Sequence, residues 1–353
     1  MQVCVTGGCG YIGSELVPRL LADGRVDGVT VLDDLSLGTP RNLMGIGIGG
    51  PARDAFTFRR GDVREYGDVE AAVRGADAVI HLAAITGASS THDRREETFD
   101  VNYEGTRNVC RAAGKHDVDT VVYASSCNIY GRAAATDIDE TTEPDPLNPY
   151  AEAKYDAETL LADAMAEHGF DGTALRMSTN YGDAPGVRFN LVVNLFVFRG
   201  LTGRPLTVYG DGSNWRPFVH VRDAARAYQH AALAPGDWPE LVYNVGSNAG
   251  NYRISEIAEA VREELDADLD VTYLEDEHPG PSYHVNFDRL AETGFETRTR
   301  LREGIRELAA RFEDDALARA RTPGADGTRG ERERAGDADG TTDDDHTHPT
   351  HTT

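Results

Sequence analysis

Apolar and polar positions follow two alternating patterns over the first half of the chain. Short runs rich in β-branched residues predict strands within residues 1–8, 26–36, 57–65, 76–86 and 118–126. Segments with apolar residues at helical spacing predict helices within residues 9–24, 102–117 and 148–169. Because the strands are almost continuously apolar and alternate with helices, the pattern indicates an α/β fold in which helices cover both faces of a parallel sheet.

The pattern changes from about residue 183, where short strands interleave with helices such as residues 253–265. We expect a first domain over residues 1–182 and a smaller lobe over residues 183–321. About residues 216–246 of the later part are expected to fold with the first domain. Residues 322–353 contain no Val, Ile, Leu, Met, Phe, Trp or Tyr, so this acidic tail cannot bury a core and is predicted to be disordered. Its histidine-containing end is predicted to be solvated and not to bind a metal.

The composition is strongly acidic and poor in lysine. The 353 residues include 60 Asp and Glu against 35 Lys and Arg, a net charge of −25, and only two of the basic residues are lysines. A surface of this charge repels nucleic acids and anionic lipids, so we expect neither as a partner. Acidic excess with few lysines indicates adaptation to a very salty cytoplasm, where a Debye length of about 3 Å at 1 M salt screens the self-repulsion.

The sequence gives no sign of export, membrane insertion or a structural metal. No apolar run reaches the ~20 residues of a membrane span, and the first strand begins without a basic leader. The cysteines, at positions 4, 9, 110 and 127, match no metal-binding spacing and are predicted to be reduced thiols. We therefore expect a cytoplasmic protein without a metal.

The stretch TGGCGYIGS follows the first strand and opens the first helix. Gly7, Gly10 and Gly13 fit G-x-x-G-x-x-G, and G-x-G-x-x-G is matched from position 8. Glycines allow a tight turn and the close approach of a pyrophosphate, which the helix N-terminus can bind. Asp33 comes 20 positions after Gly13 at the end of the second strand, where a carboxylate binds the ribose hydroxyls of NAD and repels the 2′-phosphate of NADP. The sequence predicts NAD as the cofactor.

Tyr150 and Lys154 form a second motif, YAEAK, on one face of the third predicted helix. Asn148 is a candidate N-cap for this helix, and a proline follows in the first turn. Lysine has been replaced by arginine almost everywhere else in the chain. Its retention at 154 indicates a site that needs a compact ammonium group.

These motifs belong to an ordered series that also includes VLDDLSLGT, GDVRE, HLAA, NYEGT, SSCNIYG, LRMSTNYG, WRPFVHVRDAARA and YNVG. Through this series residues 1–315 resemble the extended short-chain dehydrogenase/reductases, in the nucleotide-sugar epimerase/dehydratase branch that includes UDP-glucose 4-epimerase. The resemblance implies a Rossmann-type doubly wound sheet with a smaller, interleaved substrate lobe, bound NAD and a nucleotide-sugar substrate. It also implies a homodimer formed by the helices at 102–114 and 151–169.

The resemblance assigns roles to individual residues. The implied catalytic set is Ser126, Tyr150 and Lys154. The implied cofactor contacts are Gly7, Gly10, Tyr11, Ile12, Gly13, Asp33, Asp62, Val63, Leu82, Ala83, Ala84, Asn102, Tyr150 and Lys154. The implied substrate contacts are Ser126, Thr179, Asn194 and Arg216, of which Arg216 would bind the diphosphate. Two positions depart from the family pattern, since Thr179 stands where many epimerases have Asn and His278 where a second phosphate-binding Arg is common.

The two positions after Ser126 distinguish the reactions of this branch. Sugar 4,6-dehydratases carry an Asp-Glu pair there, and decarboxylases of nucleotide sugar acids usually carry Glu at the second position, whereas this chain has Cys127 and Asn128. A thiol with an ordinary pKa of about 8.5 is a weak substitute for a carboxylate. We therefore expect 4-epimerisation of a UDP-sugar, in which Tyr150 takes the proton of the sugar hydroxyl as the carbon is oxidised.

Alternatives of other classes stay open at this point. A ketoreductase or a GDP-fucose synthase-like epimerase/reductase would consume NAD(P)H. GDP-fucose synthase-like enzymes use a cysteine in this loop, but at the position that Asn128 occupies here. Cys127 is therefore predicted to be a packed residue. A non-enzymatic dinucleotide sensor is disfavoured because this chain keeps both Tyr150 and Lys154. His81 and His220 lie in apolar strands and are predicted to belong to the core.

Overall fold

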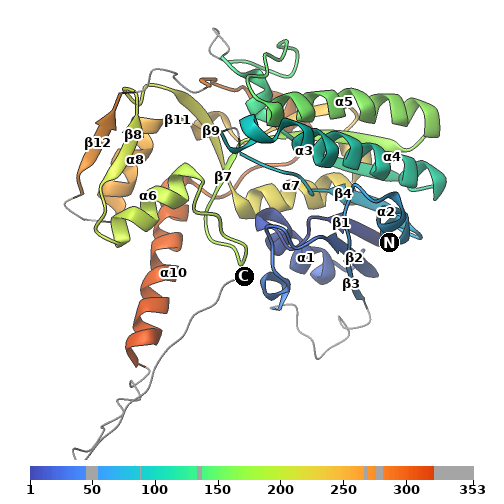
Figure 1. Ribbon diagram of the computed structural model, residues 1–353, viewed down its shortest axis with the longest axis horizontal. Coiled ribbons are helices and arrows are strands. Elements are labelled where there is room, and N and C mark those ends of the chain that lie inside the picture. Colours follow the sequence, from blue (N-terminus) through green and yellow to red (C-terminus); the bar gives the residue numbers. More distant parts are fainter. Residues whose placement is uncertain (45–54, 88, 133–136, 266–268, 276–280, 322–353) are drawn as a thin grey trace, which may run out of the picture. The chain divides into compact units, whose positions relative to one another are not determined.

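The computed structural model describes residues 1–44, 55–87, 89–132, 137–265, 269–275 and 281–321. A seven-stranded sheet of order β10-β6-β5-β4-β1-β2-β3 forms its centre, and all neighbouring strands are parallel (Figure 1). The strands are β1 (Gln2–Thr6), β2 (Gly28–Asp33), β3 (Phe56–Arg60), β4 (Ala78–His81), β5 (Thr120–Ser126), β6 (Asp171–Met177) and β10 (Val242–Val245). The predicted Rossmann-type doubly wound fold is confirmed.

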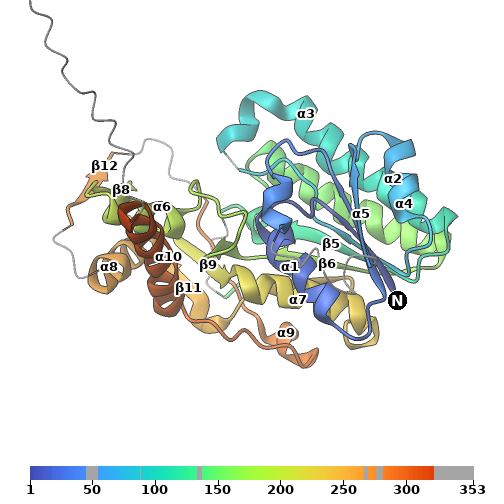
Figure 2. The same ribbon diagram turned by 90° about the horizontal axis from the view of Figure 1, so that it is seen from below.

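Helices cover both faces of this sheet (Figures 1 and 2). One face packs against α1 (Tyr11–Ala22) and α7 (Val221–Leu233), and the other against α2 (Tyr66–Val73), α4 (Gly105–Lys115) and α5 (Pro149–His168). Successive side chains of a strand point to opposite faces, so Val3 and Val5 belong to the first core and Cys4 to the second. Burial on both faces is the reason that the strands are apolar at nearly every position.

A second group of elements has its own apolar core. It contains a three-stranded sheet of order β11-β9-β7 and a two-stranded parallel sheet of β12 and β8. The strands are β7 (Thr179–Tyr181), β8 (Leu206–Tyr209), β9 (Trp215–His220), β11 (Asn251–Arg253) and β12 (Val271–Leu274). The helices of this group are α6 (Val192–Leu201), α8 (Ile254–Glu264) and α10 (Leu301–Arg321), whereas α9 (Asp288–Glu292) packs against β10 and α3 (Arg95–Phe99) against α5.

The observed elements differ from the predicted ones at several boundaries. The helix predicted from residue 102 begins earlier, because a π-helical turn at Asp100–Glu104 joins α3 to α4. The strand predicted over 57–65 ends at Arg60, after which the N–H of Asp62 bonds the Asp68 carboxylate. Within residues 216–246, α7 and β10 belong to the central sheet while β9 belongs to the smaller one. Residues Met1–Asp314 form one compact unit, and a division at residue 182 stays a prediction.

Several expectations concern cysteines, metals, membranes and the tail. All four cysteines are free and buried. Across the described ranges, no cluster of three His, Cys, Asp or Glu is arranged to hold a metal ion. Within those same ranges no helix has the length and apolar composition needed to cross a bilayer. His278 and the tail from residue 322 lie outside the described residues.

Candidate active site

The carboxyl ends of β1, β4 and β5 meet at one edge of the central sheet. The strand order reverses between β1 and β4, and ligands of such sheets bind in the crevice beside this point. The glycine loop follows β1, residues 82–84 follow β4, and Ser126 ends β5. The structure therefore brings three separate sets of predicted residues to the same edge.

The glycine loop has no room for side chains at two of its positions. Gly7 has a φ of +70°, and a Cβ there would lie 2.7 Å from the backbone nitrogen of Ala83. A Cβ at Gly13 would lie 2.6 Å from the Cα of Gly8. α1 then begins with Gly10 as its N-cap and no capping side chain. This cradle of backbone at a helix N-terminus fits a dinucleotide pyrophosphate.

Asp33 is the last residue of β2 and is buried beside the glycine loop. Its Oδ2 accepts a hydrogen bond from the backbone of Cys9 at 2.9 Å, and its Oδ1 accepts one from Leu35 at 2.9 Å. Burial raises the pKa of this carboxyl group, although both backbone bonds favour the ionised form. A carboxylate held at this place fits the expected contact with ribose hydroxyls.

Four further residues predicted to contact the cofactor make different contacts within the protein. Tyr11 donates a 2.6 Å hydrogen bond from its hydroxyl to the carbonyl of Gly182, so its side chain joins α1 to the segment after β7. Ile12 is partly buried against the core. Asp62 forms an ion pair with Arg64, whose hydrogen bonds lower the pKa of the Asp62 carboxyl group, and Val63 is buried.

Residues after β4 are held from behind by buried polar groups. Asn102, in the π-helical turn, accepts from the N–H of Ile85 at 2.8 Å and donates to its carbonyl at 2.9 Å. The backbone of Ala83 donates to the hydroxyl of Thr6 at 3.2 Å, which in turn contacts His81. Burial lowers the pKa of His81 to about 3, so this core histidine is neutral. Leu82, Ala83 and Ala84 are thereby fixed in position next to Gly7.

The predicted catalytic side chains lie together at the end of β5 and the start of α5. Asn148 caps α5 by accepting from the N–H of Ala151 at 3.0 Å, as its place in the sequence predicts. The side chain of Ser126 interacts with the hydroxyl of Tyr150 and lowers its pKa. Lys154 donates to the carbonyl of Ala124 at 2.6 Å, and its Nζ lies 6.0 Å from the ring centre of Tyr150.

Burial opposes charge on both members of the Tyr-Lys pair. It raises the pKa of Tyr150, and this effect is countered by the hydrogen bond from Ser126 and by the charge of Arg188. It lowers the pKa of Lys154 to about 7, against the attraction of Glu158. Nearby positive charge is therefore what decides whether Tyr150 can act as a base near neutral pH.

Neither residue after Ser126 is placed for acid–base chemistry. The buried thiol of Cys127 donates to the carbonyl of Arg176 at 3.0 Å, and burial raises its pKa. The carbonyl oxygen of Asn128 accepts from the side chain of Asn148 at 2.9 Å, and Asn128 is also hydrogen-bonded to Tyr283. Cys127 is a packed residue, and Asn128 links the start of α5 to the segment around Tyr283.

Arg216, on β9, is a partly buried arginine that stacks on Tyr283. Its Cζ lies 5.0 Å from the ring centre, and its Nη1 donates to the carbonyl of Trp215 at 3.0 Å. Burial lowers the pKa of the guanidinium, which remains fully charged at neutral pH. An anionic ligand group would offset the cost of burying this charge.

Two candidate substrate residues have different surroundings. Thr179 is partly buried at the start of β7. Asn194 is fully buried, and its amide bonds the backbone of Gly182 at 3.0 Å, the carbonyl of Arg188 at 3.0 Å and the hydroxyl of Tyr11. This geometry argues against direct contact of Asn194 with a substrate, because its hydrogen bonds are made within the protein.

Sequence reasoning missed Asn190, Arg188 and Thr86. After β7 the dipeptide Asn-Leu occurs at 190–191 and at 194–195, and only the first of these two has an exposed asparagine. Arg188 donates to Asn190 at 3.3 Å and to Thr86 at 2.5 Å. Because the chain has 33 arginines, no local signal distinguished this one.

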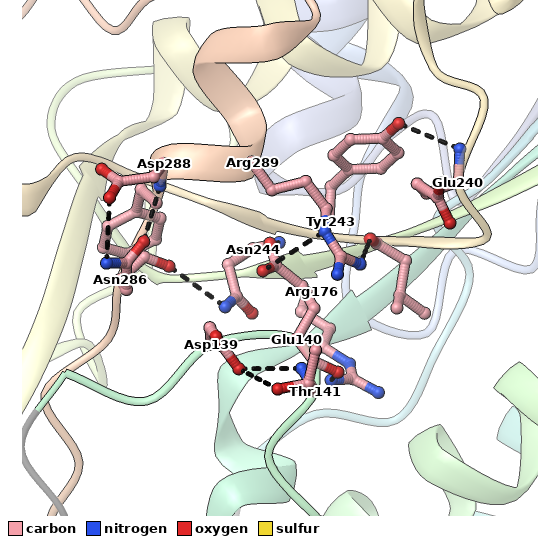
Figure 3. A network of polar contacts seen from close by, with 12 residues as sticks. Asp139, Glu140, Thr141, Arg176, Glu240, Tyr243, Asn244, Asn286, Asp288 and Arg289 are labelled. Atoms are coloured by element: carbon pink, nitrogen blue, oxygen red, sulfur yellow. Dashed lines mark hydrogen bonds and ion pairs between the residues drawn. The ribbon is translucent and has the colours of Figure 1, made fainter.

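A buried polar network supports the catalytic helix from behind. Glu158, one turn after Lys154, forms an ion pair with Arg176 at 2.7 Å and accepts from Ser125 at 2.5 Å. Figure 3 shows Arg176 in one network of polar contacts with Glu140, Asn244 and Arg289. The backbone N–H of Asn244 donates to Glu140 at 2.7 Å, and Arg289 lies 3.7 Å from the same carboxylate. This network joins α5 and β6 to β10 and α9.

Comparisons with known proteins agree with this geometry. Residues 3–246 match the model of the NAD dependent epimerase/dehydratase family. A dTDP-glucose 4,6-dehydratase of Streptomyces niveus is 31% identical over 89% of this chain and 94% of its own length. The low-salt glycan biosynthesis protein Agl12 of Haloferax volcanii is 29% identical over 86% of this chain and 96% of its own length. The crystal structure of UDP-glucose 4-epimerase from Thermus thermophilus with NAD has a TM-score of 0.76 and 30% identity, covering 89% of this chain and 99% of that one.

Proposed function

The chain belongs to the NAD-dependent epimerase/dehydratase family of extended short-chain dehydrogenase/reductases, and we propose that it is a 4-epimerase of a UDP-sugar. One observation carries this proposal. Ser126, Tyr150 and Lys154 are grouped for oxidation and reduction at a sugar hydroxyl, whereas the two positions after Ser126 hold a buried thiol and a hydrogen-bonded amide. A reaction that only oxidises and re-reduces one carbon needs Ser126, Tyr150 and Lys154. It does not need an acid or a base at positions 127 and 128.

Tyr150 is the proposed base. Its phenolate oxygen accepts the proton of the sugar hydroxyl at C4, and the phenol that results later returns this proton to the 4-keto oxygen. Ser126, whose side chain interacts with Tyr150, holds the reacting oxygen beside it. Lys154 stabilises the phenolate by its charge, and its bond to the carbonyl of Ala124 fixes the ammonium in place.

The residues around the crevice fit NAD. The glycine cradle holds the pyrophosphate, since a Cβ at Gly7 or Gly13 would fill that space, and Asp33 takes the ribose hydroxyls. Bound NAD supplies the hydride acceptor and donor for the sugar carbon. Epimerisation also requires that the keto sugar can turn within the site and present its other face.

On the substrate side, Arg216 is the proposed diphosphate contact, and Thr179 a proposed sugar contact. The exposed Asn190 is a better candidate than the buried Asn194 for a contact with the nucleotide. The similarity to a UDP-glucose 4-epimerase supports UDP as the nucleotide.

A 4,6-dehydratase is the second candidate, because a dTDP-glucose 4,6-dehydratase is 31% identical to this chain. Incubating the protein in molar salt with UDP-glucose, UDP-galactose, their N-acetyl forms and dTDP-glucose, without added cofactor, tests both. The proposal expects the 4-epimer of a UDP-sugar. A 4-keto-6-deoxy product would support the dehydratase. In a separate incubation with added NADH or NADPH, consumption of one cofactor molecule per product molecule would identify a ketoreductase.

A further inference from the structure

The ammonium group of Lys154 is buried, and its one direct hydrogen bond is to a neutral oxygen. Its Nζ donates to the carbonyl of Ala124 at 2.6 Å. Glu158 attracts the charge from one turn further along α5, but its carboxylate is engaged by Arg176 at 2.7 Å and by Ser125 at 2.5 Å. Burying an ammonium group is costly unless nearby groups offset its charge. A further attractive contact with Lys154 therefore matters for the site.

The ring of Tyr123, on β5, provides such a contact. Its centre lies 4.8 Å from Nζ of Lys154, whereas the ring centre of Tyr150 lies 6.0 Å away. The negative face of an aromatic ring attracts a cation within about 6 Å, and the attraction is stronger where water is excluded. Tyr123 is fully buried, and the ring of His81 lies 5.8 Å from its ring at an angle of 32°. The Tyr123 ring is thus held between the core and the ammonium group.

The ionisable groups that face Lys154 come from three elements. They are His81 on β4, Tyr123 on β5, and Tyr150 and Glu158 on α5 itself. Burial lowers the pKa of His81 to about 3 and raises that of Tyr123, so both are neutral at neutral pH. Glu158 is the anion of this set and is shared with a second cation. The ring of Tyr123 and the carbonyl of Ala124 are therefore the direct contacts that favour a charged Lys154.

We propose that Tyr123 is a positioning residue that acts through Lys154, because the face of its ring holds the ammonium group in place beside Tyr150 and favours the charged form. This inference rests on the proposed role of Lys154 in stabilising the Tyr150 phenolate. Tyr123 directly precedes Ala124, so two consecutive residues of β5 hold the same ammonium group. An aliphatic side chain at position 123 would fill the space and offer no negative face to the cation.

The ionisation of Lys154 can be followed directly, because the chain contains only one other lysine, Lys115. Labelling the Cε of lysine with ¹³C gives two NMR signals in the full chain, and Lys115→Arg identifies the signal of Lys154. The titration compares the parent with Tyr123→Leu, Tyr123→Phe and the control Val121→Ala. Val121 belongs to the same buried core as Tyr123, so its truncation loosens that core and leaves the ring in place.

We expect Tyr123→Leu to lower the pKa of Lys154 by about one unit, the size that a desolvated cation–π contact implies. Tyr123→Phe keeps the ring and should stay close to the parent, as should Val121→Ala. Thermal melting in molar salt checks that each variant is folded. Tyr123→Met is a second replacement without a ring, and it should give the same shift if Tyr123→Leu does not fold.

The pH profile of kcat gives the second readout. Lys154 must be protonated to stabilise the phenolate, so activity is lost as the pH rises through its pKa. In Tyr123→Leu this limb should move to lower pH by about the same amount while KM changes little. Tyr123→Phe should keep the limb of the parent.

Two outcomes would overturn the inference. One is a pKa of Lys154 that is unchanged or raised in a folded Tyr123→Leu or Tyr123→Met protein. The other is an equal shift in Val121→Ala, which would assign the effect to a loosened core instead of the lost ring. The NMR titration needs no substrate, so it can fail while the proposed reaction stands, and the product assay can fail without changing the titration.

Discussion

At the scale of single residues, the proposed chemistry depends on Tyr150 losing a proton. Burial favours the neutral phenol, and the hydrogen bond from Ser126 and the nearby cations favour the phenolate. Shifting a phenol from an ordinary pKa of about 10 to about 7 requires roughly 4 kcal/mol of interaction. The nicotinamide cation of bound NAD⁺ would supply a further positive charge.

Removing the hydroxyl of Tyr150 tests its role as the base. We expect Tyr150→Phe to lower kcat by about 10²- to 10⁴-fold, the usual range for a general base, while folding and NAD binding stay near normal. Steady-state kinetics and NAD titration measure these effects. Tyr209→Phe is the matched control, because Tyr209 is 65% exposed and away from the site. Near-normal turnover of Tyr150→Phe would remove Tyr150 from the mechanism.

Cofactor choice should depend on the charge of Asp33. Asp33→Asn keeps the size of the side chain and removes the repulsion of the 2′-phosphate, so NADP should bind about tenfold better relative to NAD, which corresponds to roughly 1.4 kcal/mol. Calorimetric titration of cofactor-depleted protein with NAD and NADP measures this ratio. Asp34→Ala, a change of the exposed neighbouring carboxylate, should leave the ratio unchanged. Equal affinity of the parent protein for both cofactors would contradict the assignment.

The residues that could be predicted from sequence are those fixed by local spacing. Gly7, Gly13, Tyr150 and Lys154 lie within short motifs whose geometry follows from a turn or a helix. The choice between Asn190 and Asn194 could not be predicted, because both precede leucine and only the path of the loop decides which one is buried. How these side chains meet bound ligands stays a prediction.

At the scale of elements, α5 carries two of the three proposed catalytic side chains and a residue that supports them. Asn148 caps it, and Tyr150, Lys154 and Glu158 follow at intervals of four residues along one face. Glu158 anchors this face to β6 through Arg176 and to β5 through Ser125. The helix is thereby fixed over the end of β5, where Ser126 lies.

Breaking this anchor should be costly. The side chains of Glu158 and Arg176 are only 4% and 5% exposed, and removing one member of a buried ion pair costs about 3–5 kcal/mol. We expect Glu158→Ala to lower the free energy of unfolding by that amount, as measured by urea denaturation in molar salt. The control Glu259→Ala breaks a surface ion pair with Arg262, 46% exposed on each side, and should cost less than about 1 kcal/mol. Similar losses in both variants would show that the buried pair does not anchor α5.

Elements of the central sheet could be predicted because each strand carries its own apolar run and a helix follows it. The pairing of β8 with β12 could not, because Leu206 and Val271 are far apart in sequence and neither strand has a long apolar pattern. The π-helical turn that aims Asn102 at Ile85 has no sequence signature either. Such features depend on contacts that form only when the chain is folded.

At the scale of the whole molecule, the charge of −25 and the scarcity of lysine lead us to propose a halophilic cytoplasmic enzyme. The similarity to a protein of Haloferax volcanii supports this proposal. We also propose a homodimer through α4 and α5. The structure leaves few apolar side chains of α5 for contact with a second subunit. Ala153, Ala157, Leu161 and Ala164 are buried within the subunit, and Leu160 is partly exposed.

Assembly should therefore depend on salt. Two subunits of the same high charge repel each other, and this repulsion is well screened only at high ionic strength. We expect a dimer in molar salt that dissociates or loses activity as the salt concentration falls below a few hundred millimolar. Light scattering and activity assays across a salt series measure this. A monomer at every salt concentration would contradict the interface, and full activity of a dimer without salt would contradict the salt adaptation.

The most direct test of the proposed reaction is to run it in heavy water and follow the sugar by NMR. Oxidation and re-reduction at C4 return the same hydrogen to the carbon, so we expect a UDP-sugar 4-epimer that forms without added cofactor and has no deuterium in the ring. Loss of water between C5 and C6 instead exchanges the C5 hydrogen with solvent. A 4-keto-6-deoxy product carrying deuterium at C5 would contradict the account and identify a dehydratase.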